Sequence, residues 1–384
     1  MKYCIKCLQP DTRPNIFFSD DGVCPACNYF AEYKSIDWSE RSQILQDLVK
    51  KYRNPSAQYD CIIGVSGGKD SCRQAIWVRD FLKLRPLLVS VSYPPHQLSN
   101  LGADNISSLI ESGFDVISVC PAPITWKKLM KSAFVNYANF AKATELALFA
   151  AVPQLAIDYK IPIILWGENP GLQLGDLETL GNTGYDGNNL RNMNTLGGGG
   201  LDWMIQQGFD EKDLIPFRYP SKEDFLKHDI KIVYLGWFLG DWSLLNNGAI
   251  SALSGLKIRH DRVQDTGDLY GVSALDEPWV TLNQMIKYYK FGFGRASDYI
   301  NEMIRLELIT RCEAIPILEK YDGCCATEYI KSFCEYIDIS FKYFWEKVIS
   351  VTDKSLFEIE GHIEIEGHIE IKRKFIIGTG KTTE

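Results

Sequence analysis

The segment Ser66–Ser71 (S-G-G-K-D-S) has residue types, in an order, that can bind a phosphate group. Its two adjacent glycines leave out the Cβ atoms that would block close approach of the ligand. If a helix begins within the segment, its first backbone N–H groups point at the anion and the helix dipole favours negative charge. Ser66, Lys69 and Ser71 add further donors. We therefore expect this segment to bind the phosphate tail of a nucleotide.

The segment is not a Walker A loop, G-x-x-x-x-G-K-[S/T]. Asp70 follows the lysine, and Ile63 stands where a Walker A loop has its first glycine. A second candidate, Gly380-Lys381-Thr382, has Phe375 at that place and is followed by only two residues, too few for the helix that the loop requires. We treat this second candidate as a chance match.

Four cysteines near the start of the sequence have the spacing of a metal site. The pairs Cys4-x-x-Cys7 and Cys24-x-x-Cys27 are separated by 16 residues, which is typical of a tetrahedral Cys4 zinc ribbon. A module this short would not hold together without metal. A redox pair is the alternative, but two matched pairs favour four ligands. Because four cysteines leave no open coordination position, we expect a structural Zn²⁺.

The phosphate-binding segment must be positioned by a strand before it and a helix after it. Residues 59–65 form an apolar run typical of a buried strand, and the apolar residues of 72–84 recur at helical spacing. Similar runs alternate with helical segments, which predicts an α/β protein with a Rossmann-like, mostly parallel sheet that binds ligands at the carboxyl ends of its strands. The later predicted strands are 87–93, 115–119, 161–166 and 231–235.

Gly167, Glu168 and Asn169 follow the strand predicted at 161–166, so they should face the same crevice as Ser66–Ser71. A carboxylate beside a triphosphate is unfavourable unless a cation lies between them, and Glu168 could therefore hold Mg²⁺ or orient the substrate. We assign Gly167 to nucleotide binding and Glu168 and Asn169 to catalysis. The alternative is a turn that caps the next helix.

Residues 171–200 are rich in glycine, asparagine and aspartate. A loop of this length in a compact enzyme is usually functional or disordered, and its place directly after a site strand favours a substrate lid. Between 279 and 349 the apolar period is helical. The expected domains are a zinc ribbon at 1–35, a linker helix at 36–58, a nucleotide-binding domain at 59–255 that includes the lid, a mostly helical region at 256–355 and a β-rich tail at 356–384.

The tail contains a direct repeat, E-G-H-I-E-I, at 360–365 and 366–371. The strict alternation of isoleucine with polar residues predicts strands. His362 and His368 have the appearance of metal ligands, but the repetition of the whole unit favours exposed strand residues.

Four charged residues are candidates for contacts with the substrate. Asp241 follows the last predicted strand of the sheet, and Arg259 and His260 lie in a run of charged residues. Arg295 ends a stretch, beginning at Lys287, that interleaves basic with aromatic residues and could bind phosphates or bases. A solvated loop explains the charged run equally well, and packing at a helix end explains the aromatic residues.

The composition limits the partners of the chain. A net charge of −8 and a pI near 5.3 argue against a protein whose affinity depends on the nucleic-acid backbone. No apolar run reaches the roughly 18 residues of a membrane span, and the first residues do not resemble a signal peptide. We expect a cytoplasmic protein with no nucleic-acid partner and no membrane span, whose eleven cysteines are thiols and metal ligands.

The form S-G-G-x-D-S resembles the pyrophosphate loop of the PP-loop ATPases, also called N-type ATP pyrophosphatases. The resemblance implies that ATP presents its α-phosphorus to a substrate oxygen, that pyrophosphate leaves, and that a nucleophile then displaces AMP. It implies that Lys69 offsets the charge of the phosphates and that Asp70 interacts with Mg²⁺ or with the helix N-terminus. Both residues are counted as catalytic. The implied pyrophosphate cradle is Ser66, Gly67, Gly68 and Ser71. Backbone contacts to adenine would come from the next strand, at Val89, Ser90 and Val91.

The nucleophile is either sulfur, as in tRNA thiolation, or ammonia. Outside the zinc ribbon the other seven cysteines form no C-x-x-C pair, and the acidic composition disfavours tRNA, so ammonia is preferred. The chain has no glutaminase signature of its own. Cys4 is assigned to the metal, and no cysteine lies in a Gly-x-Cys-x-Gly turn. We therefore expect a separate glutaminase to supply the ammonia.

Several motifs together resemble the N-acetyl sugar amidotransferase family of bacterial surface-polysaccharide pathways. Beyond the cysteines and the Ser66–Ser71 loop, they are P-D-T-R-P at 10–14, W-G-E-N-P at 166–170, F-G-F-G-R-A-S-D at 291–298 and I-T-R at 309–311. The resemblance implies ATP-dependent conversion of an acetamido to an acetamidino group on a diacetamido sugar, either a UDP-linked uronic acid or a nonulosonic acid, in O-antigen or other surface-glycan biosynthesis. It also implies a partner glutaminase paired with a cyclase-like barrel subunit.

Two other functions stay open on the sequence. Some tRNA-thiolating PP-loop enzymes also carry a zinc module before the loop, and co-purified tRNA or an iron–sulfur chromophore would favour that reading. A nucleotide-binding scaffold of a polysaccharide assembly complex would bind ATP without cleaving it.

Overall fold

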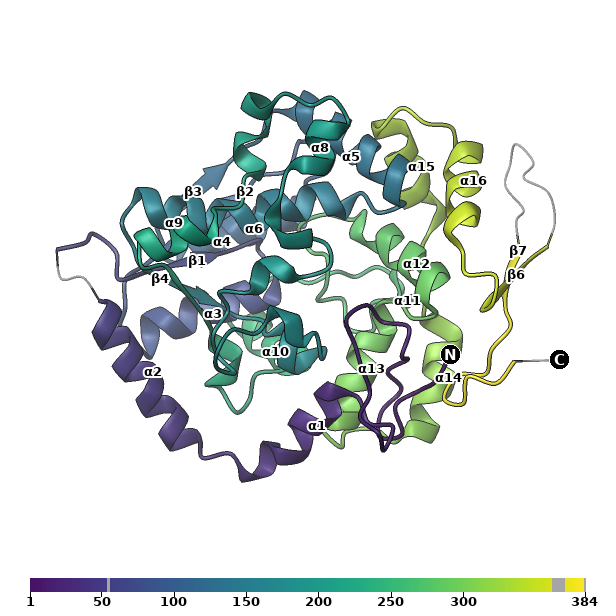
Figure 1. Cartoon of the computed structure of the whole chain (residues 1–384), viewed down its shortest axis with the longest axis horizontal. Helices are drawn as coiled ribbons and strands as arrows, with labels where there is room; N and C mark the ends of the chain where they lie inside the picture. Colours follow the sequence, from purple (N-terminus) through teal and green to yellow (C-terminus); the bar gives the residue numbers. More distant parts are fainter. Residues whose placement is uncertain (54–55, 361–369, 383–384) are drawn as a thin grey trace.

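The computed structural model describes residues 1–53, 56–360 and 370–382. Its centre is a five-stranded parallel sheet in the order β3-β2-β1-β4-β5, which confirms the predicted Rossmann-like α/β class (Figure 1). The strands are β1 Cys61–Gly64, β2 Pro86–Val91, β3 Val116–Val119, β4 Ile163–Trp166 and β5 Lys231–Tyr234. Because the strand order reverses between β1 and β4, the carboxyl ends of these two strands form the switch point where a ligand binds.

Helices connect the strands and cover the sheet. Those of the first part of the chain are α1 Pro25–Glu32, α2 Trp38–Tyr52, α3 Lys69–Asp80, α4 Asn100–Glu111, α5 Pro123–Tyr137, α6 Ala141–Asp158, α7 Pro170–Gln173, α8 Asp202–Gln206, α9 Lys222–Lys227, α10 Leu244–Leu253 and α11 Val263–Thr266. Short 3-10 turns are η1 Tyr33–Ser35, η2 Leu177–Thr179, η3 Leu190–Asn192, η4 Gly197–Gly199, η5 Glu211–Phe217 and η6 Leu235–Trp237. No helix in these described ranges is both long enough and apolar enough to cross a bilayer.

Each face of the sheet has its own apolar core. Ile62 of β1 and Ile164 of β4 point into a core shared with α5 and α6, whereas Ile63 and Leu165 point into a core shared with α2, α3 and α4. Successive strand residues face opposite sides, and here both sides are buried. The strands therefore occur in the sequence as continuous apolar runs.

The C-terminal part of the chain is helical, as predicted. Its helices are α12 Val280–Phe291, α13 Arg295–Arg305, α14 Arg311–Tyr321, α15 Thr327–Tyr336 and α16 Phe341–Val351. Gly292 ends α12 with a φ of 77°, and Thr310 begins α14 with a capping box. The region shares the α5–α6 core, where the rings of Phe134 and Phe344 stack at 5.3 Å.

The N-terminal module, residues 1–35, packs on α13 and α14. The Leu8 N–H donates to Asn301 Oδ1 at 2.7 Å, and Arg311 Nη1 donates to the Cys4 carbonyl at 2.6 Å. Figure 1 shows the N-terminus beside these two helices, while α2 leads away from the module to the sheet. The N-terminal module therefore lies against helices that come much later in the sequence.

The glycine-rich segment 171–200 is folded against the edge of the sheet. Asp186 forms a bridge with Val233 of β5, and the Gly187 N–H donates to the Ile232 carbonyl at 2.8 Å. Leu190 is fully buried. The substrate-lid function of this segment and the predicted domain limits stay predictions.

Two short strands, β6 Phe357–Glu360 and β7 Glu370–Arg373, pair in antiparallel register near the end of the chain. Most of the hexapeptide repeat lies between them. The prediction for His362 and His368 falls outside the described residues.

Candidate nucleotide and substrate site

The Ser66–Ser71 segment joins β1 to α3. Gly68 is the N-cap of α3, and no side chain caps this helix in the described structure, so the N–H groups of its first turn are left for another acceptor. Gly67 has a φ of 77°, and an added Cβ would lie 3.0 Å from the Gly102 carbonyl oxygen of α4. A turn this close to α4 requires glycine. Its bare backbone and uncapped helix fit a bound phosphate.

Lys69 and Asp70 are held in place by each other and by α10. Lys69 Nζ donates to Asp70 Oδ2 at 2.6 Å, Asn247 Nδ2 donates to Asp70 Oδ1 at 2.5 Å, and Ser251 Oγ donates to the Lys69 carbonyl at 2.6 Å. Burial lowers the pKa of Lys69, but Asp70, Tyr299 and Glu168 outweigh it, so the pKa is raised above its ordinary value. Burial raises the pKa of Asp70, but Lys69 and Asn247 outweigh burial, so the pKa of Asp70 is lowered. Both groups are therefore charged at neutral pH.

Glu168 follows β4 and faces Asp70 across the switch point, as predicted for the carboxyl ends of neighbouring strands. Desolvation by the surrounding protein and the negative charge of Asp70 raise the pKa of Glu168 to about 7. Its side chain nevertheless reaches solvent. Two carboxyl groups that repel each other beside a phosphate loop have the oxygen ligands that Mg²⁺ prefers.

Asn169 has a local structural role. Its Oδ1 accepts from the Leu172 N–H at 3.2 Å, which caps α7, and its Nδ2 donates to the Gly184 carbonyl at 2.7 Å. Both polar atoms are used and the side chain is 1% exposed. The structure therefore does not support a catalytic role for Asn169, and the helix-cap alternative describes it.

Gly167 is required for packing. An added Cβ would lie 2.8 Å from the Trp242 ring and 3.0 Å from Gln74 Oε1. The glycine lets Trp242 close over the carboxyl end of β4, behind the phosphate loop. Nothing in these contacts tests its predicted role in nucleotide binding.

The backbone of β2 extends past its partner β1. Pairing with β1 ends at Gly64 and Val89, whereas pairing with β3 continues to Val91 and Val119. The backbone of Ser90 and Val91 therefore lies beyond the last paired residue of β1, on the side of the phosphate loop. Their side chains are buried in the core, so an adenine contact would come from the backbone.

The four predicted substrate residues lie in different surroundings. Asp241 accepts a hydrogen bond from Arg73 Nη2 at 2.5 Å, and His260 is exposed. Arg259 and Arg295 line one small pocket between the 259–274 segment and the helical region. The structure thus brings Arg259 and Arg295 to one pocket, which Asp241 and His260 do not line. Arg259 is already occupied, because it donates to Tyr329 Oη at 2.8 Å and to Asp261.

A charged cluster beside Arg295 was missed from the sequence. Arg13 forms an ion pair with Asp298, and Lys287 Nζ lies 3.3 Å from Asp298 Oδ2. Burial raises the pKa of Asp298, but the charges of Lys287, Arg13 and Arg295 outweigh burial and hold this pKa well below its usual range. The sequence signal was the motif at 291–298, but nothing local relates it to Arg13 in the N-terminal module.

The four predicted metal ligands lie together. The Sγ atoms of Cys4, Cys7, Cys24 and Cys27 are all within 4.8 Å of one another, and all four cysteines are buried. The Cys24 N–H donates to Cys4 Sγ at 3.2 Å and the Gln9 N–H to Cys7 Sγ at 3.4 Å. Four buried thiols, two of which accept backbone hydrogen bonds, are a donor set that fits a tetrahedral metal ion.

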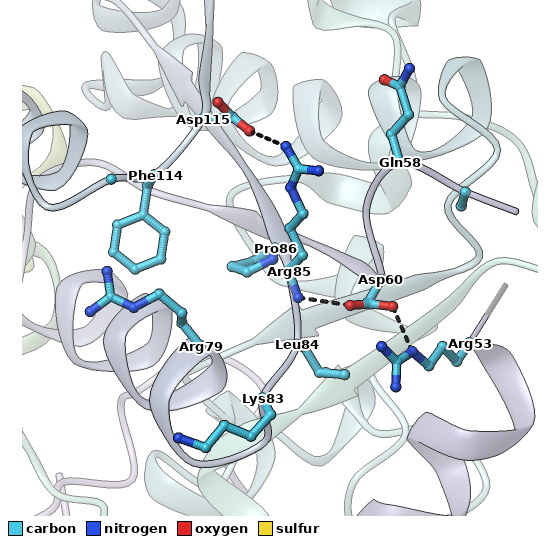
Figure 2. A pocket seen from close by; sticks show the side chains of 12 residues that line it. Arg53, Gln58, Asp60, Arg79, Lys83, Leu84, Arg85, Pro86, Phe114 and Asp115 are labelled. Atoms are coloured by element: carbon cyan, nitrogen blue, oxygen red, sulfur yellow. Dashed lines mark hydrogen bonds and ion pairs between the residues drawn. The ribbon is translucent and has the colours of Figure 1, made fainter. Parts of the chain in front are cut away.

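A wide hollow of about 820 Å³ lies at the opposite end of the sheet, before β1, β2 and β3 (Figure 2). Its arginines are paired with acids: Arg53 with Asp60 at 2.7 Å, and Arg85 with Asp115 at 3.1 Å. Ligands of open parallel sheets bind at the other end of the strands. Despite its size, this hollow is not the nucleotide site.

A parallel sheet with an uncapped, glycine-rich turn after its first strand, joined to a Cys4 module, is the α/β architecture that the resemblance to the PP-loop ATPases implies. Residues 268–367 match the family model described as "LPS biosynthesis protein WbpG-like, C-terminal domain". The chain thus carries a WbpG-like C-terminal domain beside the Ser66–Ser71 loop. This match supports the resemblance to the amidotransferase family that the sequence motifs indicate.

Other comparisons add little. The chain matches no curated protein sequence. Among solved structures it is similar to the U34-tRNA thiolase NcsA from Methanococcus maripaludis with its [4Fe-4S] cluster, at 13% identity over 85% of this chain and 84% of that chain. The TM-score is 0.31, and we base no argument on this likeness.

Proposed function

We propose that the chain is the synthetase subunit of an ATP-dependent amidotransferase that acts on a diacetamido sugar. The acetamido oxygen forms a bond to the α-phosphorus of ATP as pyrophosphate leaves. Ammonia then forms a bond to the activated carbon and loses a proton, and the oxygen departs with AMP. The products are an acetamidino group, AMP and pyrophosphate. An amide carbon resists amines because its oxygen leaves poorly, and AMP is the better leaving group.

The observation that carries this proposal is the place of the WbpG-like domain. Tyr299 of α13 lies close enough to Lys69 to contribute to its raised pKa, and Glu302 Oε2 accepts from the Leu244 N–H of α10 at 2.6 Å. α10 in turn holds Lys69 and Asp70. A domain of lipopolysaccharide-biosynthesis proteins therefore forms part of the wall around a nucleotide loop, which supports a nucleotide-dependent reaction on a surface-glycan precursor.

The residues of the loop have separate roles in the proposed reaction. Ser66, Ser71 and the first N–H groups of α3 bind pyrophosphate, and Lys69 offsets its charge. Asp70 and Glu168 are the residues that would hold Mg²⁺, which supplies positive charge to the leaving pyrophosphate when bound. Zn²⁺ on the four cysteines would stabilise the N-terminal module. We further propose that ammonia comes from a separate glutaminase with a cyclase-like barrel subunit.

The direct test supplies the purified chain with ATP, Mg²⁺, ammonium and a UDP-diacetamido-uronic acid. We expect AMP, pyrophosphate and an amidine product in equal amounts. Chromatography of the nucleotides and mass spectrometry of the sugar measure these products. A free diacetamido nonulosonic acid serves as the second substrate. Formation of ADP, or of AMP without an amidine from any of these sugars, would contradict the proposal.

A further inference from the structure

A cluster of charged side chains surrounds Asp298 where α12, α13 and the N-terminal module meet. Arg13 and Lys287 both pair with this one carboxylate. The Phe293 ring lies between them, with Arg13 Cζ 4.3 Å and Lys287 Nζ 4.7 Å from its centroid. Both cations are thus fixed by an ion pair and by an aromatic face.

Arg295 is the third cation of this cluster. In the described part of the chain it forms no hydrogen bond or ion pair, although it is close enough to Asp298 and Glu168 to lower their pKa values. It lines the small pocket together with Thr281 and Gln284. Gln284 Oε1 is buried there without a partner among the described residues. The free guanidinium can bind an anionic group of a ligand, and the unpaired Gln284 oxygen would accept from a hydroxyl or N–H group of the same ligand.

Positive charge exceeds what Asp298 can neutralise. Burial lowers the pKa of Lys287 to about 8; Asp298 opposes this shift, whereas the charges of Arg13 and Arg295 add to it. The neighbouring Asp322 also opposes the lowered pKa of Lys287, while its carboxylate accepts from the Gly294 N–H at 2.8 Å and from Ser297 Oγ at 2.5 Å. Glu145 is a further carboxyl group near Lys287 and Arg295, but neither acid forms an ion pair with Arg295 in the described residues. An added anion would relieve the repulsion among the three cations.

The cluster also lies at the right place relative to the nucleotide loop. Tyr299 is near both Lys69 and Arg295, and its hydroxyl shares a hydrogen bond of 2.5 Å with Ser273 Oγ at the pocket wall. Glu168 likewise interacts with both Lys69 and Arg295, so Arg295 lies in the surroundings of the Ser66–Ser71 loop. A sugar whose acetamido oxygen approaches ATP at the loop would extend a second group towards Arg295.

We propose that Arg295, supported by Lys287, binds an anionic group of the sugar substrate, a carboxylate or a diphosphate, and that Arg13 of the N-terminal module is a positioning residue that holds Asp298 in place. This inference rests on the proposed function. Arginine suits the role because its planar guanidinium binds carboxylate and phosphate oxygens in pairs.

The test separates sugar binding from turnover. Calorimetry measures the affinity of wild type and of Arg295→Gln for UDP-diacetamido-uronic acid, for the UDP-diacetamido-hexose that lacks the carboxylate, and for the free diacetamido-uronic acid that lacks the diphosphate. We expect Arg295→Gln to weaken binding about 30-fold or more only for sugars that carry the recognised anion. If only the UDP-diacetamido-hexose keeps its affinity, the recognised anion is the carboxylate. If only the free diacetamido-uronic acid keeps its affinity, the recognised anion is the diphosphate. ATP affinity should stay within about twofold.

Two further variants complete the design. Arg295→Lys keeps the charge and should recover part of the affinity, and Arg262→Gln, at an exposed ion pair, should behave as wild type. Arg13→Ala should weaken binding of the anionic sugar about tenfold while the metal content and ATP affinity stay constant, and Arg13→Lys should restore it in part.

Equal weakening for all three sugars, a parallel loss of ATP affinity, or no loss at all in Arg295→Gln would overturn the subsite. Absence of sugar binding by the wild type would do the same. Absence of an amidine product while the anion-dependent binding persists would instead contradict the proposed reaction and leave the subsite supported.

Discussion

Lys69 shows how one side chain can be prepared for a ligand before the ligand arrives. A buried ammonium is costly unless it is paired, and here its partner is the next residue in the same helix turn. Asp70 is itself held by Asn247, so the pair cannot rotate away from the loop. The lysine is therefore charged and in place beside the uncapped start of α3, where the proposed triphosphate would bind.

We expect Lys69→Ala to lower the rate of AMP formation about 100-fold or more, because one fixed donor to the phosphates is lost. The variant also leaves Asp70 buried without its cation, which should lower the free energy of unfolding by about 3 kcal/mol. Pyrophosphate release and urea denaturation measure the two effects. Lys83→Ala, at the hollow at the opposite end of the sheet, is the control and should leave the rate and the free energy of unfolding unchanged. A normal rate in Lys69→Ala would exclude its phosphate role.

A second buried carboxyl group predicts how stability depends on pH. Burial and the adjacent Asp276 raise the pKa of Glu277 to about 8. A carboxyl whose pKa rises on folding holds its proton more tightly in the folded state. Its contribution to stability is therefore fully present below the unfolded pKa of about 4.3 and is lost as the pH rises towards 8.

Glu277→Gln removes this titration and keeps an acceptor for the Trp279 N–H, which lies 2.9 Å from Glu277 Oε2. We expect the variant to melt at a higher temperature than wild type at pH 8, and the difference to shrink towards pH 5. Scanning calorimetry across this range measures it, with the exposed Glu111→Gln as the matched control. A difference that does not change with pH would contradict the raised pKa of Glu277.

At the scale of elements, the turn between β1 and α3 depends on its contact with α4. Gly67 and Gly113 both have positive φ, at 77° and 90°, but only Gly67 is crowded. An added Cβ at Gly67 would lie 3.0 Å from the Gly102 carbonyl oxygen, whereas nothing lies within 4 Å of the same position at Gly113. Substitutions at the two glycines can therefore distinguish the effect of backbone strain alone, at Gly113, from the effect of displacing the Ser66–Ser71 loop, at Gly67.

We expect Gly67→Ala to weaken ATP binding about tenfold or more, because the loop must move away from α4. Gly113→Ala should show only the cost of strain, about 1 kcal/mol in the free energy of unfolding, with normal ATP affinity. Calorimetry with ATP and thermal unfolding of both variants measure the contrast. Equal ATP affinity in the two variants would show that the position of the loop is not critical.

The elements that local sequence patterns determine were predicted well. Continuous apolar runs marked the strands because the sheet is buried on both faces, and Ser66–Ser71 marked the start of α3 because a tight strand-to-helix turn needs glycine. Asn169 was assigned to chemistry because it follows a site strand, yet Pro170 after it also marks a helix start. The charged cluster could not be predicted, because Arg13 and Asp298 are brought together only by tertiary packing.

At the scale of the whole molecule, the N-terminal module and the C-terminal region share one core. Leu8 lies in the same apolar cluster as Ala296 and Ile300 of α13 and as Phe357 and Phe375 of the tail. Residues 1–35 are too few to bury a core of their own, so this shared packing stabilises the module and a metal ion on the four cysteines would add to it. Because α13 also carries Arg295 and Tyr299, loss of the metal should be felt at the substrate site.

Removal of the metal with a chelator should therefore loosen α13 and α14 while the parallel sheet stays folded. We expect the melting temperature to fall on the order of 10 °C and amide hydrogen exchange to rise over 295–321, with little change in α3 and α5. Cys4→Ser should reproduce the effect, because it removes a ligand, whereas Cys312→Ser at an exposed thiol should not. Unchanged exchange in α13 after complete loss of metal would show that the module and the substrate site are independent, and the positioning role of Arg13 would then have no structural basis.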